Sequence, residues 1–163
     1  MKIGLISDTH DRLPSIRRAV EIFNDEDVEI ILHGGDHIAP FSLESFKPSN
    51  TKLIGVCGNL DAEYELLRRG YEENGWTFHR HFASLELEGS IALLHGISDD
   101  IVKGLAKSGE FNVIVRGHIH KRQKKIIEET LLVCPGEACG YLSGKSSIAV
   151  LEMPTRKLRF IDL

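Results

Sequence analysis

The sequence predicts a layered α/β fold, and two observations support the prediction. Strand-like and helix-like stretches alternate through the first half of the 163-residue chain. The second half is richer in strand-like stretches, two of which form an expected hairpin. Alternating β and α units followed by hairpins favour a layered α/β architecture over a plain doubly wound sheet.

In the first half, three expected strands alternate with three expected helices. Short apolar runs that end in polar residues are typical of buried parallel strands, and they occur at 2–7, 29–32 and 52–56. Pro14 suits the first turn of a helix, while Asp61 is a candidate N-cap and Gly75 suits a helix end. The expected helices follow Pro14, span 42–46 and run from Asp61 to about Asn74.

The second half contains one expected helix among several strands. Gly89 separates two alternating stretches, which predicts a hairpin. The helix covers 99–107 and ends before Gly109. The expected strands are 84–88, 90–94, 112–115, 124–128, 131–133, 147–152 and 157–161.

Composition limits the classes of protein to which the chain can belong. Its length predicts a single domain over residues 1–163, and 42% hydrophobic residues suffice for a core. The net charge of −4 and the lack of a basic block argue against dedicated nucleic-acid binding. The sequence shows neither a bilayer-spanning apolar run nor a signal-peptide pattern, so we expect a cytoplasmic protein without a membrane partner. Three cysteines without CxxC spacing predict free thiols.

Polar clusters follow the strands that we expect to be central. In open α/β sheets, ligands bind outside the carboxyl ends of the strands, so these clusters are expected to meet in one region. Aspartate, asparagine and histidine donors without a thiolate suit Mn²⁺, Fe, Zn²⁺, Ni²⁺ or Co²⁺. Two residues that lie two positions apart in an extended segment face the same way, as in Asp8-Thr9-His10 and His118-Ile119-His120. The expected metal ligands are Asp8, His10, Asp36, Asn59, His95, His118 and His120.

The clusters together give the chain a resemblance to a known family. In order, they read Asp8-Thr9-His10, Gly35-Asp36, Gly58-Asn59-Leu60-Asp61, His95 and Gly117-His118-Ile119-His120. This pattern resembles that of the calcineurin-like metallophosphoesterases, and specifically their small, single-domain phosphodiesterase branch. The resemblance implies a four-layer α/β sandwich, in which two mixed β-sheets pack face to face and helices cover the outer faces.

The resemblance also implies a metal-dependent phosphodiesterase that uses two metal ions and a bridging hydroxide. One divalent ion would bind Asp8, His10 and His120, and a second would bind Asn59, His95 and His118, with Asp36 shared. We expect Mn²⁺ first among the candidate ions. Two divalent ions, two aspartates and one hydroxide leave a net positive charge, which suits a phosphodiester. The expected substrate is therefore a small phosphodiester.

One position departs from the family pattern. Many relatives carry histidine between the asparagine and the acidic residue, whereas this chain has Leu60, which cannot transfer a proton. Loss of this general acid should slow diesters with poor leaving groups most, so we expect a preference for aryl diesters unless another group substitutes. His37, directly after Asp36, is the candidate substitute. Asp61 is a candidate orienting residue as well as a candidate helix cap, and Asn59 and Arg12 are candidate phosphate contacts.

Alternatives remain at this level. The family includes a phosphoesterase-like subunit of the retromer coat that acts mainly as a binding platform, so a scaffold role with little catalysis is one alternative. Another alternative is phosphomonoester hydrolysis or nuclease action at the same metal site. The sequence does not specify an oligomeric partner, although exposed apolar residues leave room for a homodimer.

Overall fold

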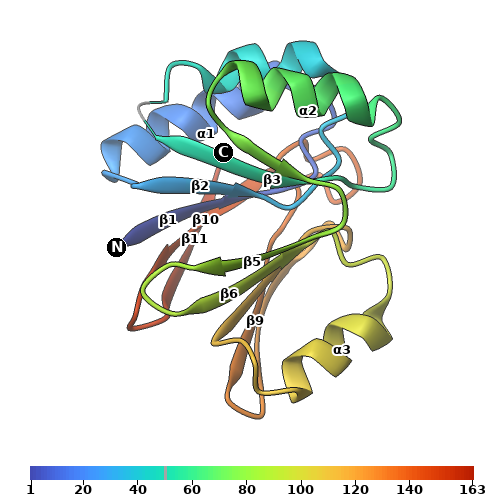
Figure 1. Ribbon diagram of the computed structural model, residues 1–163. Coiled ribbons are helices and arrows are strands. Elements are labelled where there is room, and N and C mark those ends of the chain that lie inside the picture. The colour runs from blue at the N-terminus through green and yellow to red at the C-terminus, as the bar shows by residue number, and fades with distance from the viewer. Residues whose placement is uncertain (50) are drawn as a thin grey trace.

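Two β-sheets form the centre of the molecule (Figure 1). The computed structural model describes residues 1–49 and 51–163. The six-stranded sheet has the order β11-β10-β1-β2-β3-β4, and the five-stranded sheet has the order β5-β6-β7-β9-β8. In the first sheet the strands are β1 (Lys2–Ile6), β2 (Ile30–His33), β3 (Lys52–Val56), β4 (Thr77–His79), β10 (Ser147–Glu152) and β11 (Lys157–Asp162). In the second they are β5 (Phe82–Glu86), β6 (Ser90–Leu94), β7 (Val113–Arg116), β8 (Arg122–Ile127) and β9 (Thr130–Pro135).

Both sheets are mixed. Strands β1, β2, β3 and β4 run parallel to one another, while β10 is antiparallel to β1. In the second sheet β6, β7 and β9 are parallel, and β5 and β8 pair antiparallel at the two edges. The carboxyl ends of β1, β2, β3 and β6 lie at the same side of the molecule in Figure 1, and β7 runs parallel to β6 with Arg116 opposite Leu94.

Helices cover the outer face of each sheet, which gives four layers. Helices α1 (Leu13–Asp25) and α2 (Tyr64–Glu73) and the 3₁₀ helix η1 (Pro40–Phe46) lie on the six-stranded sheet, whereas α3 (Asp99–Lys107) lies on the five-stranded sheet (Figure 1). Helix α1 is amphipathic and buries Ile16, Val20 and Phe23, whose spacing of three and four residues places them on one face.

Three apolar clusters correspond to the three spaces between the layers. The first joins α1, η1 and α2 to the outer face of the six-stranded sheet and includes Phe23 and Tyr71. The second lies between the sheets and includes Leu5, Leu93 and Val115. The third, smaller cluster packs α3 against β6, β7 and β9. Burial of these side chains removes apolar surface from water and supplies the main stabilising contribution to the fold.

The structure confirms the four-layer α/β fold class and corrects some element boundaries. Strand β4 has only three residues and was not predicted, and the segment expected as a short helix is a 3₁₀ helix. Helix α2 begins at Tyr64, and its N-cap position is Glu63 rather than Asp61. The three cysteines are free thiols. Among the described residues, no helix combines the length and apolarity needed to cross a membrane.

Candidate metal centre

The predicted donors follow the ends of five parallel strands from both sheets. Asp8 and His10 follow β1, Asp36 follows β2, and Asn59 follows β3. From the other sheet, His95 follows β6, and His118 and His120 follow β7. These strand ends meet across the interface between the sheets, so segments far apart in the sequence contribute to one site (Figure 1).

The first group of donors consists of Asp8, His10, Asp36 and His120. Each of these residues offers one ligand atom, and the four atoms all lie within 4.8 Å of one another. His10 Nε2 is 3.6 Å from Asp36 Oδ2, and His120 Nε2 is 3.5 Å from Asp8 Oδ1. Two carboxylates and two imidazoles at these separations form a donor set of the kind that binds a divalent transition metal.

The second group consists of Asn59, His95 and His118. Asn59 Oδ1 lies 2.8 Å from His95 Nε2 and 3.0 Å from His118 Nδ1. His95 Nε2 is also 3.5 Å from Asp36 Oδ2, so Asp36 lies between the two groups. The structure therefore brings all seven predicted donors together, arranged as two groups around one shared carboxylate.

The backbone at these donors is strained, and this differs from the expected geometry. Asp8 and His10 have φ of 52° and 41°, and His118 and His120 have φ of 68° and 54°. These segments are therefore not extended, and the prediction that alternation along a strand orients their side chains was wrong. Left-handed conformations in residues other than glycine cost free energy and cluster at functional sites, where the surrounding structure imposes them.

Two glycines let these loops approach one another closely. A Cβ at Gly58 would overlap the Asp36 carboxylate, and a Cβ at Gly117 would overlap the side chain of Ser7. Each glycine directly precedes a predicted donor, Asn59 or His118. The close packing of the loops therefore requires glycine at these two positions.

Hydrogen bonds fix the orientation of two histidines. His120 Nδ1 lies 2.8 Å from Glu137 Oε2, and His95 Nδ1 lies 2.8 Å from the carbonyl oxygen of Gly34. When a neutral imidazole donates its single N–H through Nδ1, Nε2 carries a free lone pair. The lone pair of His120 Nε2 then faces the Asp8 carboxylate, and that of His95 Nε2 faces the Asn59 amide oxygen. A cation between each nitrogen and the oxygen that it faces would stabilise this arrangement.

Glu137 was missed by the sequence reasoning. It is fully buried and also accepts hydrogen bonds from the backbone N–H groups of Leu142 and Ser143. Although burial favours the neutral form, hydrogen bonds from Ser143 and His120 lower the pKa of Glu137 to about 2. The ionised Glu137 therefore holds His120 in place. Its position after the Pro135-Gly136 turn carried no spacing signal that linked it to His120.

Asp61 joins the loops that carry Asp36 and Asn59. Its carboxylate accepts hydrogen bonds from the backbone N–H groups of Asp36, Ile38 and Gly58 at 2.8–3.0 Å. It does not cap α2, so the helix-cap alternative for Asp61 was wrong. Burial opposes ionisation of this carboxyl, but His37 and the backbone donors outweigh it and hold its pKa well below the usual range.

His37 is fully buried, which conflicts with the predicted role of general acid. Its Nδ1 lies 3.1 Å from Asp61 Oδ2, and its Nε2 lies 2.7 Å from the Tyr71 hydroxyl oxygen. Its ring stacks on His33 with 3.6 Å between centroids. Both ring nitrogens are engaged and no part of the side chain is exposed, so His37 cannot touch a substrate and instead supports Asp61.

Arg12 and Leu60 lie at the edge of the site. The Arg12 guanidinium donates to the carbonyl oxygen of Cys139 and lies over the Tyr141 ring at 5.6 Å from its centroid. The Leu60 side chain is 51% exposed, and its backbone N–H donates to Asp36 Oδ1 at 2.9 Å. The expected phosphate contact by Arg12 remains a prediction, while Leu60 leaves an apolar surface beside Asn59.

Burial also controls the charges of the donors themselves. Burial, together with the nearby Asp36 carboxylate, raises the pKa of Asp8 to about 7 despite opposing hydrogen bonds. Burial lowers the pKa of His10 and of His95, which favours the neutral imidazole that binds metals. Cys139 lies within 4.8 Å of His10 and His120, but burial raises its thiol pKa to about 12, so it stays protonated and donates to Glu137.

The residues present fit a divalent metal ion. His10 Nε2 is buried without a hydrogen-bond partner among the described residues, although it points at Asp36. A buried imidazole nitrogen without a partner is costly, and a bound cation would satisfy it. Three observations therefore agree with a metal centre: the types of donor, the imidazole lone pairs that face oxygen atoms, and the buried His10 nitrogen without a hydrogen-bond partner.

Comparisons with known proteins identify relatives along the whole chain. Residues 1–156 match the family model for the calcineurin-like phosphoesterase superfamily domain. The chain is 38% identical to phosphodiesterase MJ0936 of Methanocaldococcus jannaschii over 165 residues, covering 100% of this chain and 99% of the relative. It is 31% identical to a probable metallophosphoesterase of Methanothermobacter thermautotrophicus, and the alignment covers 97% of this chain and 89% of the relative. A solved structure described as a novel archaeal phosphodiesterase superimposes with a TM-score of 0.96 at 37% identity, with both chains covered completely.

Proposed function

Because this chain belongs to the calcineurin-like phosphoesterase superfamily, we propose that it hydrolyses phosphodiester bonds of small substrates with two divalent metal ions. One observation carries the proposal. Seven donor side chains from five strand ends form two adjacent groups that share the Asp36 carboxylate. Adjacent metal sites that share a ligand are the arrangement on which two-metal phosphoryl transfer depends.

Each group would hold one ion. Asp8, His10 and His120 would bind the first, and Asn59, His95 and His118 would bind the second, with Asp36 as ligand to both. Bound ions would supply an activated water as nucleophile and stabilise the charge that develops on the phosphate oxygens. Mn²⁺ is the proposed metal, with Ni²⁺, Zn²⁺, Fe and Co²⁺ as alternatives, because the donors are imidazole, carboxylate and amide.

The chain's own residues position these groups. Glu137 and the Gly34 carbonyl hold the rings of His120 and His95, so that their Nε2 atoms face the centre. Asp61 fixes the Asp36 and Gly58 backbones and therefore the spacing between the two groups. The Asn59 side chain is exposed, so its amide N–H lies where it can donate to a phosphate oxygen as well.

Charge favours a diester over a monoester. The only acidic ligands in the predicted set are Asp8 and Asp36, since Asn59 adds no charge. The resulting modest positive charge suits a phosphodiester with about one negative charge. The names printed for the curated relative and for the solved structure described above, both phosphodiesterases, support the same substrate class. Arg12, at the edge of the site, is the proposed further phosphate contact.

The test is hydrolysis by metal-stripped protein to which single metals are restored. We expect Mn²⁺ to restore turnover of bis(4-nitrophenyl) phosphate far more than of 4-nitrophenyl phosphate. Asn59→Ala should remove this turnover, whereas Asn24→Ala, a substitution on α1, should keep it. Faster monoester than diester turnover would favour a phosphomonoesterase instead. Folded protein that binds metal yet hydrolyses neither compound would contradict the proposed function.

A further inference from the structure

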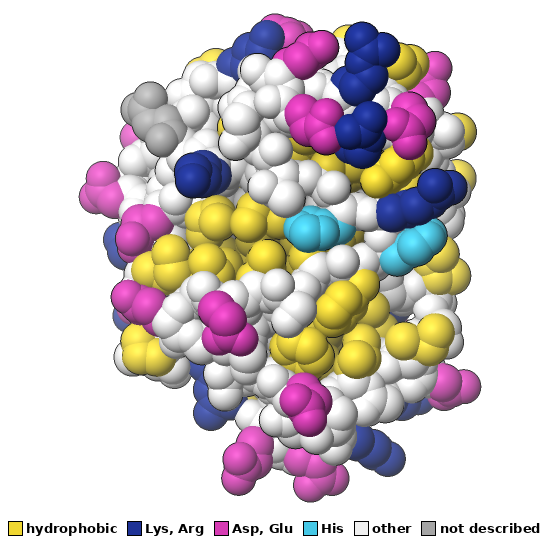
Figure 2. Space-filling view, in the orientation of Figure 1, with side chains coloured by type: hydrophobic (Ala, Val, Ile, Leu, Met, Phe, Trp, Pro, Cys, Tyr) yellow, Lys and Arg dark blue, Asp and Glu magenta, His cyan; other side chains and the backbone are white. Residues whose placement is uncertain are grey.

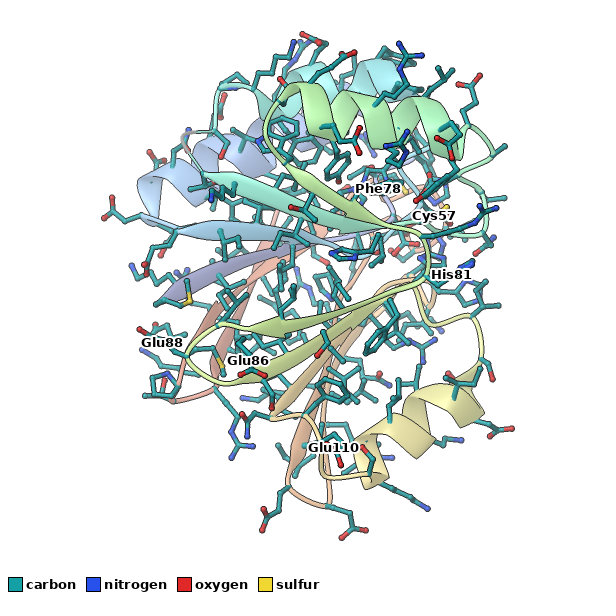
Figure 3. All side chains as sticks on the ribbon, viewed as in Figure 1. Cys57, Phe78, His81, Glu86, Glu88 and Glu110 are labelled. Atoms are coloured by element: carbon teal, nitrogen blue, oxygen red, sulfur yellow. The ribbon has the colours of Figure 1, made fainter. Side chains whose placement is uncertain are left out.

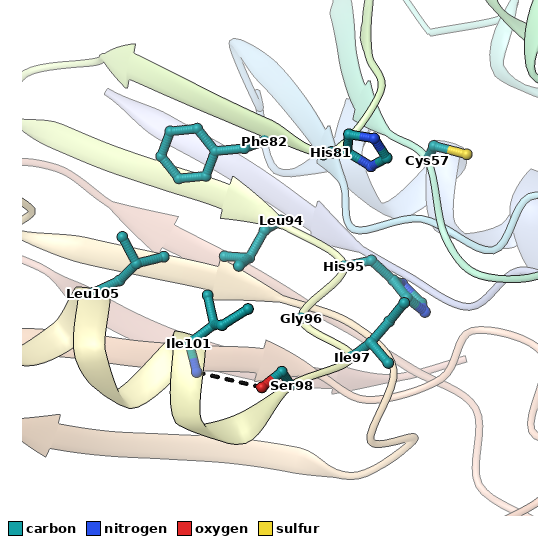
Figure 4. Close-up of a pocket in the computed structure, with 10 residues that line it drawn as sticks. All are labelled: Cys57, His81, Phe82, Leu94, His95, Gly96, Ile97, Ser98, Ile101 and Leu105. Atoms are coloured by element: carbon teal, nitrogen blue, oxygen red, sulfur yellow. Dashed lines mark hydrogen bonds between the residues drawn. The ribbon is translucent and has the colours of Figure 1, made fainter.

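An apolar groove adjoins the candidate metal centre. It has a volume of about 480 Å³ and lies between α3 and the β5–β6 edge of the second sheet (Figure 4). We call it the α3 groove and define it by five apolar residues and one histidine. These are Phe82, Leu94, His95, Ile97, Ile101 and Leu105.

The lining of the α3 groove is apolar and exposed to solvent. Ile97 and Ile101 are each 62% exposed, and Phe82 is 39% exposed. None of the described residues that line the groove is Asp, Glu, Lys or Arg. On the face shown in Figure 2, hydrophobic side chains gather below the exposed histidines, and Figure 3 places His81 and Cys57 at this same end of the molecule. Clustered apolar surface of this kind marks a binding site.

His95 connects the groove to the metal centre. It lines the α3 groove, while its Nε2 lies 2.8 Å from Asn59 Oδ1 and 3.5 Å from Asp36 Oδ2. Cys57, two residues before Asn59, also lines the groove. A phosphate held at the second group of donors would therefore lie next to the groove, whose lining includes Ile97 and Ile101.

We propose that the α3 groove is a subsite for the apolar ester group that stays on phosphorus during diester hydrolysis. This inference rests on the proposed function. In an in-line displacement, the attacking and leaving oxygens lie on opposite sides of phosphorus. The retained ester group occupies neither of these two positions, and the groove adjoins the second group of donors through His95. A volume near 480 Å³ accommodates a ring-sized group and lies in the range of small-ligand pockets.

The orientation of side chains in Figure 4 supports this occupant. Ile101 and Leu105 project from α3 toward Phe82 and Leu94, which project from β5 and β6. A flat aryl group between them would contact apolar side chains on both walls. The α3 N-terminus is capped by Ser98, whose hydroxyl accepts from the backbone N–H of Ile101. A change of the Ile101 side chain therefore leaves this backbone contact intact.

The kinetic test compares two diesters with the same leaving group. Bis(4-nitrophenyl) phosphate retains an aryl group, whereas methyl 4-nitrophenyl phosphate retains a methyl group. We expect Ile101→Gln to lower the ratio of their kcat/KM values by about tenfold, since loss of an apolar contact in a pocket has effects of this order. Ile97 lies before the helix, and Ile97→Gln should also lower the ratio of the two kcat/KM values. Ile126→Gln changes an isoleucine of similar exposure on β8, away from the groove, and should leave the ratio unchanged.

A second readout needs neither metal nor turnover. Metal-free protein with labelled isoleucine methyl groups would be titrated with diphenyl phosphate and observed by NMR. We expect the Ile97 and Ile101 resonances to shift while Ile126 does not. Dimethyl phosphate at the same concentration should shift none of the three.

The outcomes separate this inference from the proposed function. Wild-type protein that is loaded with Mn²⁺ and hydrolyses neither diester would contradict the proposed function. The NMR titration would still test the groove in that case. Turnover of both diesters with the same ratio in wild type, Ile101→Gln and Ile97→Gln would overturn the subsite. Shifts of Ile97 and Ile101 on dilution without ligand would assign the groove to a second copy of the chain and also overturn it.

Discussion

The Asp61 carboxylate accepts the backbone N–H of Asp36 at 3.0 Å, which ties the shared candidate ligand to the loop that carries Asn59. A side chain outside both groups of donors therefore sets the distance between them. The same carboxylate accepts from Ile38 and faces His37, so one buried charge organises two loops.

Asp61→Asn is predicted to weaken this link without changing the size of the side chain. One carboxylate oxygen becomes an NH₂ donor that faces backbone donors, and buried donors without partners cost about 1–3 kcal/mol. Denaturant unfolding should show a loss of stability of this size, and calorimetry should show weaker Mn²⁺ binding. The control is Asp25→Asn on the exposed end of α1, which should change stability by less than about 0.5 kcal/mol. Equal effects of the two substitutions would argue against the role of Asp61.

His37→Ala is predicted to slow aryl and alkyl diesters by the same factor. A buried positioning residue affects the site as a whole, whereas loss of a general acid slows poor leaving groups more. The substitution also removes contacts with Asp61 and Tyr71, so stability should fall by about 3 kcal/mol. For comparison, His81→Ala at an exposed position should alter stability little. Selective loss of alkyl-diester turnover would restore the general-acid interpretation.

Glu137→Gln is predicted to weaken metal binding by the first group of donors. Partners that orient a ligand histidine typically contribute about 10–100-fold to metal affinity. Isothermal titration of metal-free protein with Mn²⁺ should show one weakened site and one that is nearly unchanged. Glu110→Gln, at an exposed position far from the site (Figure 3), should bind both ions normally. Unchanged binding in Glu137→Gln would show that His120 needs no orienting partner.

Leu60→His is predicted to accelerate hydrolysis of diesters with alkoxide leaving groups. The exposed side chain lies directly after Asn59, and an imidazole there supplies the missing proton donor. General acid catalysis contributes about 10²–10⁴-fold, mostly for poor leaving groups, so 4-nitrophenyl esters should change much less. Leu60→Gln introduces a polar side chain without a comparable proton donor and should not accelerate alkyl diesters. An equal gain in both variants would indicate a polarity effect rather than proton transfer.

Much of the fold was predictable because strand ends carry the strongest local signal. Apolar runs followed by glycine and polar residues located β1, β2, β3, β6 and β7, and the rule that ligands gather at carboxyl ends predicted one site. Strand β4 was missed because three residues give no usable periodicity. The four-layer arrangement came from the family resemblance, since local patterns do not specify how two sheets pack.

The remaining features of the site depend on tertiary contacts. Glu137 and His120 are 17 residues apart, and their hydrogen bond depends on how β8 and β9 pair. Asp61 has the residue type and position of a helix cap, but the nearby Asp36 loop offers it more donors than the helix does. Positive φ at Asp8 and His10 was unpredictable because residues other than glycine rarely adopt it in isolation.

The position of the metal ions in crystals of the Mn²⁺-loaded protein tests the central claim most directly. Anomalous diffraction should show two peaks per chain, about 3.5–4 Å apart, on either side of the Asp36 carboxylate. One should be bounded by Asp8, His10 and His120, and the other by Asn59, His95 and His118. In Asn59→Ala, only the first peak should remain strong. A single peak in the wild-type protein, or ions bound away from Asp36, would contradict a two-metal centre.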